Sequence, residues 1–100
     1  MFKKKNEPVV CADGFRMSVQ ANQGAYCDPR NDTGPYTSAE IGFPNREEPM
    51  LRQWAEDPTD PTGTVYAWVP RDVILAVIAR HGGMVEGELP EGIPNLWGAS

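Results

Sequence analysis

The sequence offers few side chains that could carry out chemistry. It contains one histidine, His81, and two cysteines, Cys11 and Cys27. Two cysteines cannot form a disulfide framework, so we expect both to be thiols that pack as small hydrophobic residues. Their spacing matches no zinc-binding pattern, and His81 would add only one further ligand. We therefore expect no metal site and no cofactor.

Long apolar segments are also missing. No apolar run approaches the ~20 residues of a transmembrane helix. The charged N-terminus is not followed by the apolar region of a secretory signal. We therefore expect a cytoplasmic protein that does not interact with membranes.

Lysine is absent after residue 5. Lys3, Lys4 and Lys5 form a short basic N-terminus, and the rest of the chain carries six arginines against fourteen carboxylates, a formal balance of −8. This charge argues against direct binding to nucleic acid and suits a surface that meets a basic partner. We interpret residues 1–7 as a flexible basic N-terminus, and residues 8–100 as one compact domain with a Pro/Gly-rich C-terminal tail.

The start of this domain predicts a β-hairpin. The apolar run at residues 9–11 precedes Asp13-Gly14, a dipeptide that favours tight turns. Over residues 15–22 apolar and polar residues then alternate, which is the pattern of a strand with one buried face. We expect that buried face to consist of Phe15, Met17, Val19 and Ala21.

Two further strands are predicted after the turn-rich loop at residues 23–35. Residues 36–43 form the first, and its core-facing residues are expected to be Thr37, Ala39, Ile41 and Phe43. Residues 64–69 are β-branched or aromatic except for Ala67, and they form the second. Its two faces are expected to be Val65, Ala67 and Val69 on one side, and Tyr66 and Trp68 on the other. Both faces are apolar, which indicates either cover on both sides or an exposed aromatic pair.

Two helices are predicted as well. Pro49 suits the first turn of a short helix at about residues 49–56, in which Met50, Leu51 and Trp54 share a face. Residues 70–81 carry a continuous apolar stripe, with Gly82 as the expected C-terminal glycine. The stripe consists of Val73, Ile74, Val77, Ile78 and His81. A short strand at residues 84–86 and an anchor of the tail at Leu96-Trp97 complete the prediction.

These elements together predict an α+β fold. We expect an antiparallel sheet of three to five strands, with the main helix (about 70–81) packed on one face and the short second helix (about 49–56) elsewhere in the domain. The large core residues are expected to be Phe15, Met17, Val19, Ile41, Phe43, Val65, Val69, Val73, Ile74, Val77 and Ile78. At about 1.5–3 kcal/mol per buried large side chain, this core can support one cooperative domain.

The sequence gives little support for an enzyme. Arg30 would lower the pKa of the nearby Cys27 thiol, but Asp28 opposes this effect and no base is close in sequence. His81 ends a predicted helix, where a structural role is the simpler interpretation. Gly82 and Gly83 follow a helix, whereas a phosphate-binding glycine loop opens one. We therefore expect no enzymatic activity.

The candidate binding residues are acidic or aromatic. Aromatic residues within an acidic rim are typical of protein-binding surfaces. The acidic candidates, in predicted surface turns, are Asp28, Asp32, Glu47, Glu48, Glu56, Asp57 and Asp60. The aromatic candidates are Trp54, Tyr66 and Trp68. The alternative for these aromatic residues is packing under the loops and the C-terminal tail.

The stretch from Cys11 to Gly83 resembles small accessory proteins of phages and prophages. The segments that carry the resemblance are CADGF, MSVQA, YCDPR, GPYTSAEIGFP, WAEDP, TVYAWVP and HGG. Some phage proteins of this size and acidity are anti-CRISPR inhibitors. The resemblance implies a phage origin and action in the host bacterial cytoplasm. Its motifs are turns and strands, so it assigns no active-site or binding residue.

Two functions follow as hypotheses. The first is an inhibitor that binds a type I CRISPR surveillance complex, with carboxylates in the place of phosphates and Trp54 or Trp68 as anchors. Its partner would be a host protein or ribonucleoprotein complex with a basic surface, such as Cas proteins, and the protein itself would be a monomer or a small homo-oligomer. The second is a phage structural or assembly accessory that oligomerises through the strand carrying Tyr66 and Trp68.

Overall fold

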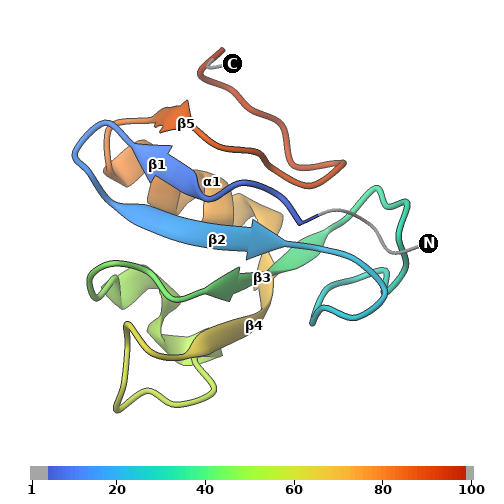
Figure 1. Cartoon of the computed structure of the whole chain (residues 1–100), viewed down its shortest axis with the longest axis horizontal. Coiled ribbons are helices and arrows are strands. Elements are labelled where there is room, and N and C mark those ends of the chain that lie inside the picture. Colours follow the sequence, from blue (N-terminus) through green and yellow to red (C-terminus); the bar gives the residue numbers. More distant parts are fainter. Residues whose placement is uncertain (1–4, 99–100) are drawn as a thin grey trace.

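Five strands form one antiparallel sheet, and a single α-helix covers one of its faces (Figure 1). The computed structural model describes residues 5–98. The strand order is β4-β3-β2-β1-β5, which leaves β4 and β5 at the edges. The strands are β1 (Val9–Cys11), β2 (Arg16–Gln20), β3 (Ser38–Gly42), β4 (Val65–Pro70) and β5 (Met84–Glu86). The predicted α+β fold and its antiparallel sheet are confirmed.

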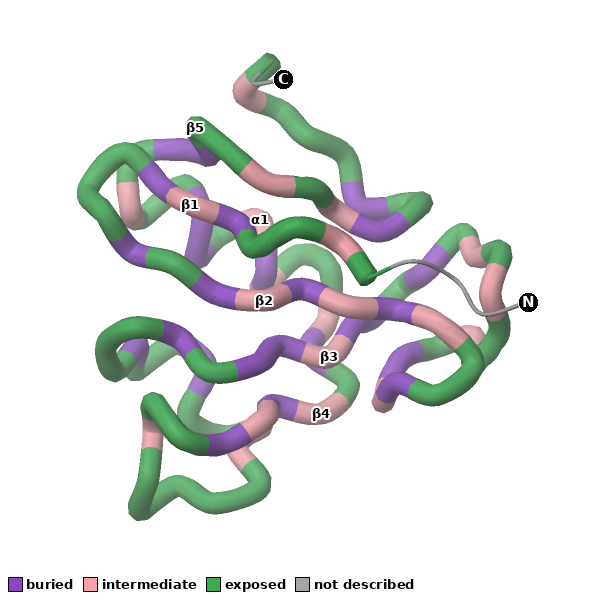
Figure 2. The backbone as a smooth tube through the Cα atoms, viewed as in Figure 1, coloured by how far each residue is buried: buried purple, intermediate pink, exposed green. Residues whose placement is uncertain are grey.

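The predicted hairpin joins β1 and β2. Val9 pairs with Met17, and the Asp13 side chain closes the turn by accepting a hydrogen bond from the Phe15 N–H at 2.9 Å. Buried residues alternate with more exposed ones along β2 (Figure 2). The predicted inner face, which includes Met17 and Val19, is fully buried, so this alternation is confirmed.

The main helix, α1 (Arg71–Arg80), begins directly after Pro70. Its apolar stripe buries Ile74, Val77 and Ile78 against the sheet, as predicted. The helix ends in a Schellman motif, in which the N–H of Gly82 donates to the carbonyl of Ala79, and the N–H of Gly83 to that of Ile78. Gly82 has a φ of +91°, the left-handed conformation expected of a glycine that ends a helix.

The short helix, η1 (Pro49–Trp54), is a 3₁₀-helix rather than an α-helix and ends earlier than predicted. Three residues per turn place Leu51 and Trp54 on one face and turn Met50 away. Leu51 is fully buried and Met50 is exposed, so the predicted common face of Met50, Leu51 and Trp54 is wrong.

A β-bulge interrupts the expected alternation in β4. Ile41 of β3 pairs with Tyr66, but Ala39 pairs with Val69, so β4 contains one additional residue between these pairs. Tyr66 and Val69 are consequently both buried, while Trp68 is exposed. The predicted common face of Tyr66 and Trp68 is therefore wrong, because the bulge turns only Trp68 outward.

The end of β3 also differs from the prediction. The strand stops at Gly42, and Phe43 has a φ of +48° and is 62% exposed, although it was expected in the core. Tyr36, which was expected on the opposite face, is instead fully buried, and its hydroxyl donates to the carbonyl of Asn31 at 2.7 Å. Because β3 ends before Phe43 and the backbone there is left-handed, the alternation of the strand no longer places this side chain in the core.

Residues 5–8 and 87–98 run along the β1–β5 side of the sheet (Figure 1). Trp97 packs against the core as the predicted anchor, whereas Leu96 is exposed. Of the predicted flexible N-terminus, residues 1–4 lie outside the described residues. Asn6 and Glu7 donate backbone hydrogen bonds to Gln20 and Glu88, at 2.9 and 2.7 Å. No helix within residues 5–98 has the length and apolarity needed to cross a bilayer.

Candidate functional site

Trp68 is the exposed aromatic residue of the β4 bulge. Its φ is +51°, and the residue is 49% exposed. Its N–H donates to the carbonyl of Tyr26 at 3.1 Å, and the two rings lie 5.0 Å apart with a tilt of 39°. The guanidinium of Arg30 lies 5.6 Å from the centre of the Tyr26 ring. Backbone and ring contacts thus hold Trp68 in one orientation.

Phe43 is a second aromatic residue that is both exposed and left-handed. Its N–H donates to the carbonyl of Thr64 at 3.1 Å, which fixes it beside the start of β4. Bulky residues rarely adopt a positive φ. Phe43 and Trp68 are the non-glycine residues of the described chain that do so.

One acidic cluster lies in the loop between η1 and β4. It consists of Glu56, Asp57 and Asp60, and within residues 5–98 no salt bridge neutralises any of them. Asp57 organises this loop: its carboxylate accepts from the hydroxyl and N–H of Thr59, and these hydrogen bonds lower the pKa of Asp57. The predicted acidic loop is thus a defined structure with all three residues exposed.

The second acidic cluster, Asp28 and Asp32, lies in the loop beside Tyr26. The backbone of Asp28 forms an isolated antiparallel β-bridge with Ser38 of β3. The Asp32 carboxylate accepts a hydrogen bond from the N–H of Gln23 at 2.8 Å. Asp28 is exposed and Asp32 is half-buried. The two clusters lie at opposite ends of the β3–β4 pair (Figure 1). The structure therefore does not bring all the predicted acidic residues together.

Three of the remaining candidates are engaged within the protein, which we did not expect. Tyr66 is 1% exposed, and its hydroxyl donates to the carbonyl of Pro61 at 2.5 Å. Burial raises the pKa of Tyr66, and the charges of Glu47 and Asp60 raise it further. Trp54 is half-buried against the core. Glu47 is exposed but is paired with Arg52 at 2.8 Å.

Glu48 is the clearest correction, because it is a buried charge rather than part of an exposed pair. Its side chain is 1% exposed and lies 3.1 Å from Arg80 Nε and 2.7 Å from His81 Nε2. Its other oxygen accepts from the N–H of Met50 at 2.8 Å and caps η1. Glu48 therefore joins η1 to the end of α1.

Sequence reasoning did not find the histidine network that results. His81 Nδ1 lies 2.6 Å from Asp13 Oδ2, and its ring stacks on Phe15 at 4.2 Å. Both ring nitrogens of His81 therefore lie within hydrogen-bond distance of a carboxylate oxygen, one of Asp13 and one of Glu48. These partners are separated from His81 by 68 and 33 positions, and no sequence spacing connects them.

Cys11 and Cys27 are both buried thiols. Burial and the nearby Asp13 raise the pKa of Cys11 to about 11, which keeps it a thiol at neutral pH. The Cys27 thiol donates to the carbonyl of Asn22 at 3.2 Å. The ring nitrogens of His81, the one histidine of the chain, face the carboxylates of Asp13 and Glu48.

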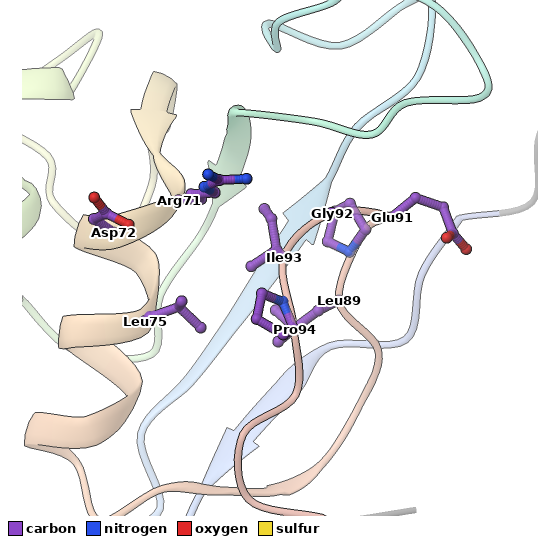
Figure 3. A pocket seen from close by; sticks show the side chains of 9 residues that line it. Arg71, Asp72, Leu75, Leu89, Glu91, Gly92, Ile93 and Pro94 are labelled. Carbon is purple, nitrogen blue, oxygen red and sulfur yellow. The ribbon is translucent and has the colours of Figure 1, made fainter.

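A groove of about 670 Å³ lies between the start of α1 and residues 89–94 (Figure 3). Leu75, Leu89 and Ile93 form its apolar wall, and Arg71 and Asp72 lie at its margin. Glu91 also lines the groove, so charges of both signs adjoin it. Among the described residues, no three His, Cys, Asp or Glu side chains are grouped in a way that could hold a metal ion.

Comparison with known proteins adds no relative. No protein-family model matches the chain, and neither the curated proteins nor the solved structures contain a significant match.

Proposed function

We propose that the protein acts by binding, as an inhibitor that occupies a basic, nucleic-acid-handling surface of a host complex. The observation that carries this proposal is the exposed cluster of Glu56, Asp57 and Asp60, which no described cation neutralises. A concentrated negative charge of this kind attracts a surface that normally receives phosphates. Asp28 and Asp32 provide a second negative region at the other end of β3 and β4.

The specific target in this proposal is a type I CRISPR surveillance complex. The resemblance to phage accessory proteins supports that choice, and the acidity of the body supports a basic groove as the binding site. The protein would compete with target DNA for the groove. Its carboxylates would raise the association rate and select the partner, while apolar contacts would slow dissociation.

Competition with DNA gives the direct test. A purified type I surveillance complex is mixed with the protein, and its binding to target DNA is followed by mobility shift at several salt concentrations. We expect the protein to displace the DNA, and its inhibition constant to rise with salt because the interaction is screened. Failure to bind the complex at low salt would remove this target.

A matched pair of charge reversals assigns the effect to the acidic loop. Glu56→Lys/Asp60→Lys should weaken inhibition at least tenfold, which corresponds to about 1.4 kcal/mol. Glu86→Lys/Glu91→Lys makes the same change in net charge on exposed residues elsewhere and should leave inhibition within about twofold. Equal losses in the two variants would show that only total charge matters.

Assembly through oligomerisation is the second candidate. One observation favours it: Trp68 is exposed at β4, an edge strand of the sheet. The burial of Tyr66 removes the other aromatic residue on which this idea depended. Sedimentation measures the oligomeric state of the parent and of Trp68→Asn. If the parent is a fixed homo-oligomer and the variant is a monomer, assembly is favoured over inhibition.

A further inference from the structure

We infer that the uncovered side of β3 and β4 is a docking surface for a basic protein segment with apolar side chains at its centre. This inference rests on the proposed binding function and names the part of the surface that holds the partner. Phe43 and Trp68 are its two anchors. The acidic clusters lie beside each end.

The alternation of side chains along β3 shows on which side of the sheet this docking surface lies. Ala39 and Ile41 are buried in the core with α1, so Glu40 between them faces the opposite side. The Glu40 carboxylate accepts from the N–H of Tyr26 at 3.0 Å. Tyr26, and the Trp68 ring packed on it, therefore lie on the side of the sheet opposite the core. Figure 1 shows that α1 covers the other side.

The surface between the two anchors is small and apolar. On β4, Tyr66 is buried in the core, so Val65 and Ala67 face the uncovered side and are half-buried. Gly42 pairs with Val65 and contributes no side chain. Phe43 follows Gly42, and Trp68 lies three residues beyond Val65, a span of ~10 Å along a strand. A short extended segment or one turn of a helix fits this span.

The backbone at both anchors indicates that exposure of these rings is not incidental. Each has a positive φ, a conformation that costs free energy for a bulky residue and persists when the surroundings enforce it. Neither ring gains burial in return, since Phe43 is 62% and Trp68 49% exposed. Exposed, orientated aromatic residues are the type of residue that dominates binding energy at protein interfaces.

Charge at the two ends specifies the partner. At one end, the backbone carbonyl of Thr64 accepts a hydrogen bond from the N–H of Phe43, and the Thr64 hydroxyl accepts one from the N–H of Asp57. Phe43, the first anchor, therefore adjoins the acidic loop. At the other end, the carbonyl of Tyr26 accepts the N–H of Trp68. The loop that follows carries Asp28, Asp32 and also Arg30, whose guanidinium lies 5.6 Å from the Tyr26 ring, so two carboxylates against one cation leave this end net negative. A partner with apolar residues between two groups of arginine or lysine matches this order of acidic, aromatic and acidic regions.

A designed peptide series provides the test. The probe is a heptapeptide with three leucines between two arginine pairs, and the full chain is labelled with ¹⁵N for chemical-shift mapping. One control peptide replaces the leucines by serine, and another replaces the arginines by glutamate. We expect the probe to shift the resonances of Phe43, Val65, Ala67 and Trp68 and to bind at least tenfold more tightly than either control.

Substitutions at the anchors complete the experiment. Phe43→Asn and Trp68→Asn keep a residue that tolerates positive φ, so each should have a melting temperature no lower than the parent and an affinity for the probe at least fivefold weaker. Leu96→Asn changes an aliphatic residue that is 64% exposed on the tail and should leave the affinity unchanged.

The outcomes separate this surface from the proposed function. Equal binding of the serine peptide, or unchanged affinity of both anchor variants, would overturn the aromatic docking surface even if the protein inhibits a surveillance complex. Self-association that the anchor variants abolish would also overturn it, because the occupant would then be a second copy. Specific binding of the probe without inhibition would support the surface and reject the target.

Discussion

The carboxylate of Glu48 lies 2.7 Å from Nε2 of His81 and is almost completely buried. Arg80 supplies a positive charge at 3.1 Å, and the Met50 N–H supplies a neutral donor. A buried carboxylate is tolerated only when such partners replace its hydration. The contact therefore ties η1 and the acidic loop that follows it to the C-terminal end of α1.

Removing one partner of this buried pair should be costly. We expect Glu48→Ala to lower the free energy of unfolding by about 3 kcal/mol, because it deletes the η1 cap and leaves the Arg80 charge and the His81 ring without their carboxylate partner. Urea denaturation measures the change. The neighbouring Glu47→Ala removes an exposed pair with Arg52 and should cost less than about 1 kcal/mol. Similar losses in both variants would contradict the assigned role of Glu48.

Local patterns in the sequence predicted most of the fold. The hairpin at Asp13-Gly14 and the helix that ends at Gly82 are encoded by neighbouring residues, through alternation, apolar periodicity and turn chemistry. The β4 bulge has no comparable local signal. It depends on the pairing of Ala39 with Val69, which lies in another strand, and it decides that Tyr66 is buried while Trp68 is exposed.

The site was less predictable because composition does not report burial. Glu47 and Glu48 are adjacent and chemically alike, but one is exposed and the other lies in the interior. The difference arises from His81, which approaches from a distant part of the chain. The acidic loop at residues 56–63, in contrast, was identified correctly because prolines and carboxylates there prevent a regular buried element.

Acid should weaken the part of the network that contains Asp13. The N–H of Phe15 lowers the pKa of Asp13 most strongly, followed by the hydrogen bond and charge of His81 and the charge of Arg46. A folded pKa below the ordinary value of 3.8 means that Asp13 stabilises the protein above that pH, and that this contribution is lost as the pH falls through the folded value.

The variant Asp13→Asn isolates this contribution. Its free energy of unfolding, measured by urea denaturation between pH 2 and 6, should lie below that of the parent near pH 6 and approach it in strong acid. Parallel curves across this range would show that the ionisation of Asp13 is not linked to folding.

The raised pKa of Cys11 predicts both slow reactivity and alkaline destabilisation. The pKa of the Cys11 thiol rises from 9.0 to about 11. Between these two pH values the thiol ionises in the unfolded chain but not in the folded protein. The free energy of unfolding should therefore fall as the pH rises from about 9 to about 11. At pH 8 the native thiol should react with iodoacetamide at least a hundredfold more slowly than in urea. Cys11→Ser should flatten the alkaline decline, and fast native labelling of Cys11 would contradict its burial.

Ser38 offers the last prediction, because its hydroxyl is buried without a protein partner among the described residues. Ser38 pairs with Pro70 in β3–β4 and is covered by the loop at Asp28. An unsatisfied buried hydroxyl destabilises the folded state, so Ser38→Ala should raise the free energy of unfolding by about 1 kcal/mol. Ser18→Ala, whose hydroxyl accepts from Gln20 Nε2 at 3.0 Å, should instead lower it by about 0.5–1 kcal/mol. A loss at Ser38 as large as that at Ser18 would mean that the Ser38 hydroxyl is hydrogen-bonded in solution.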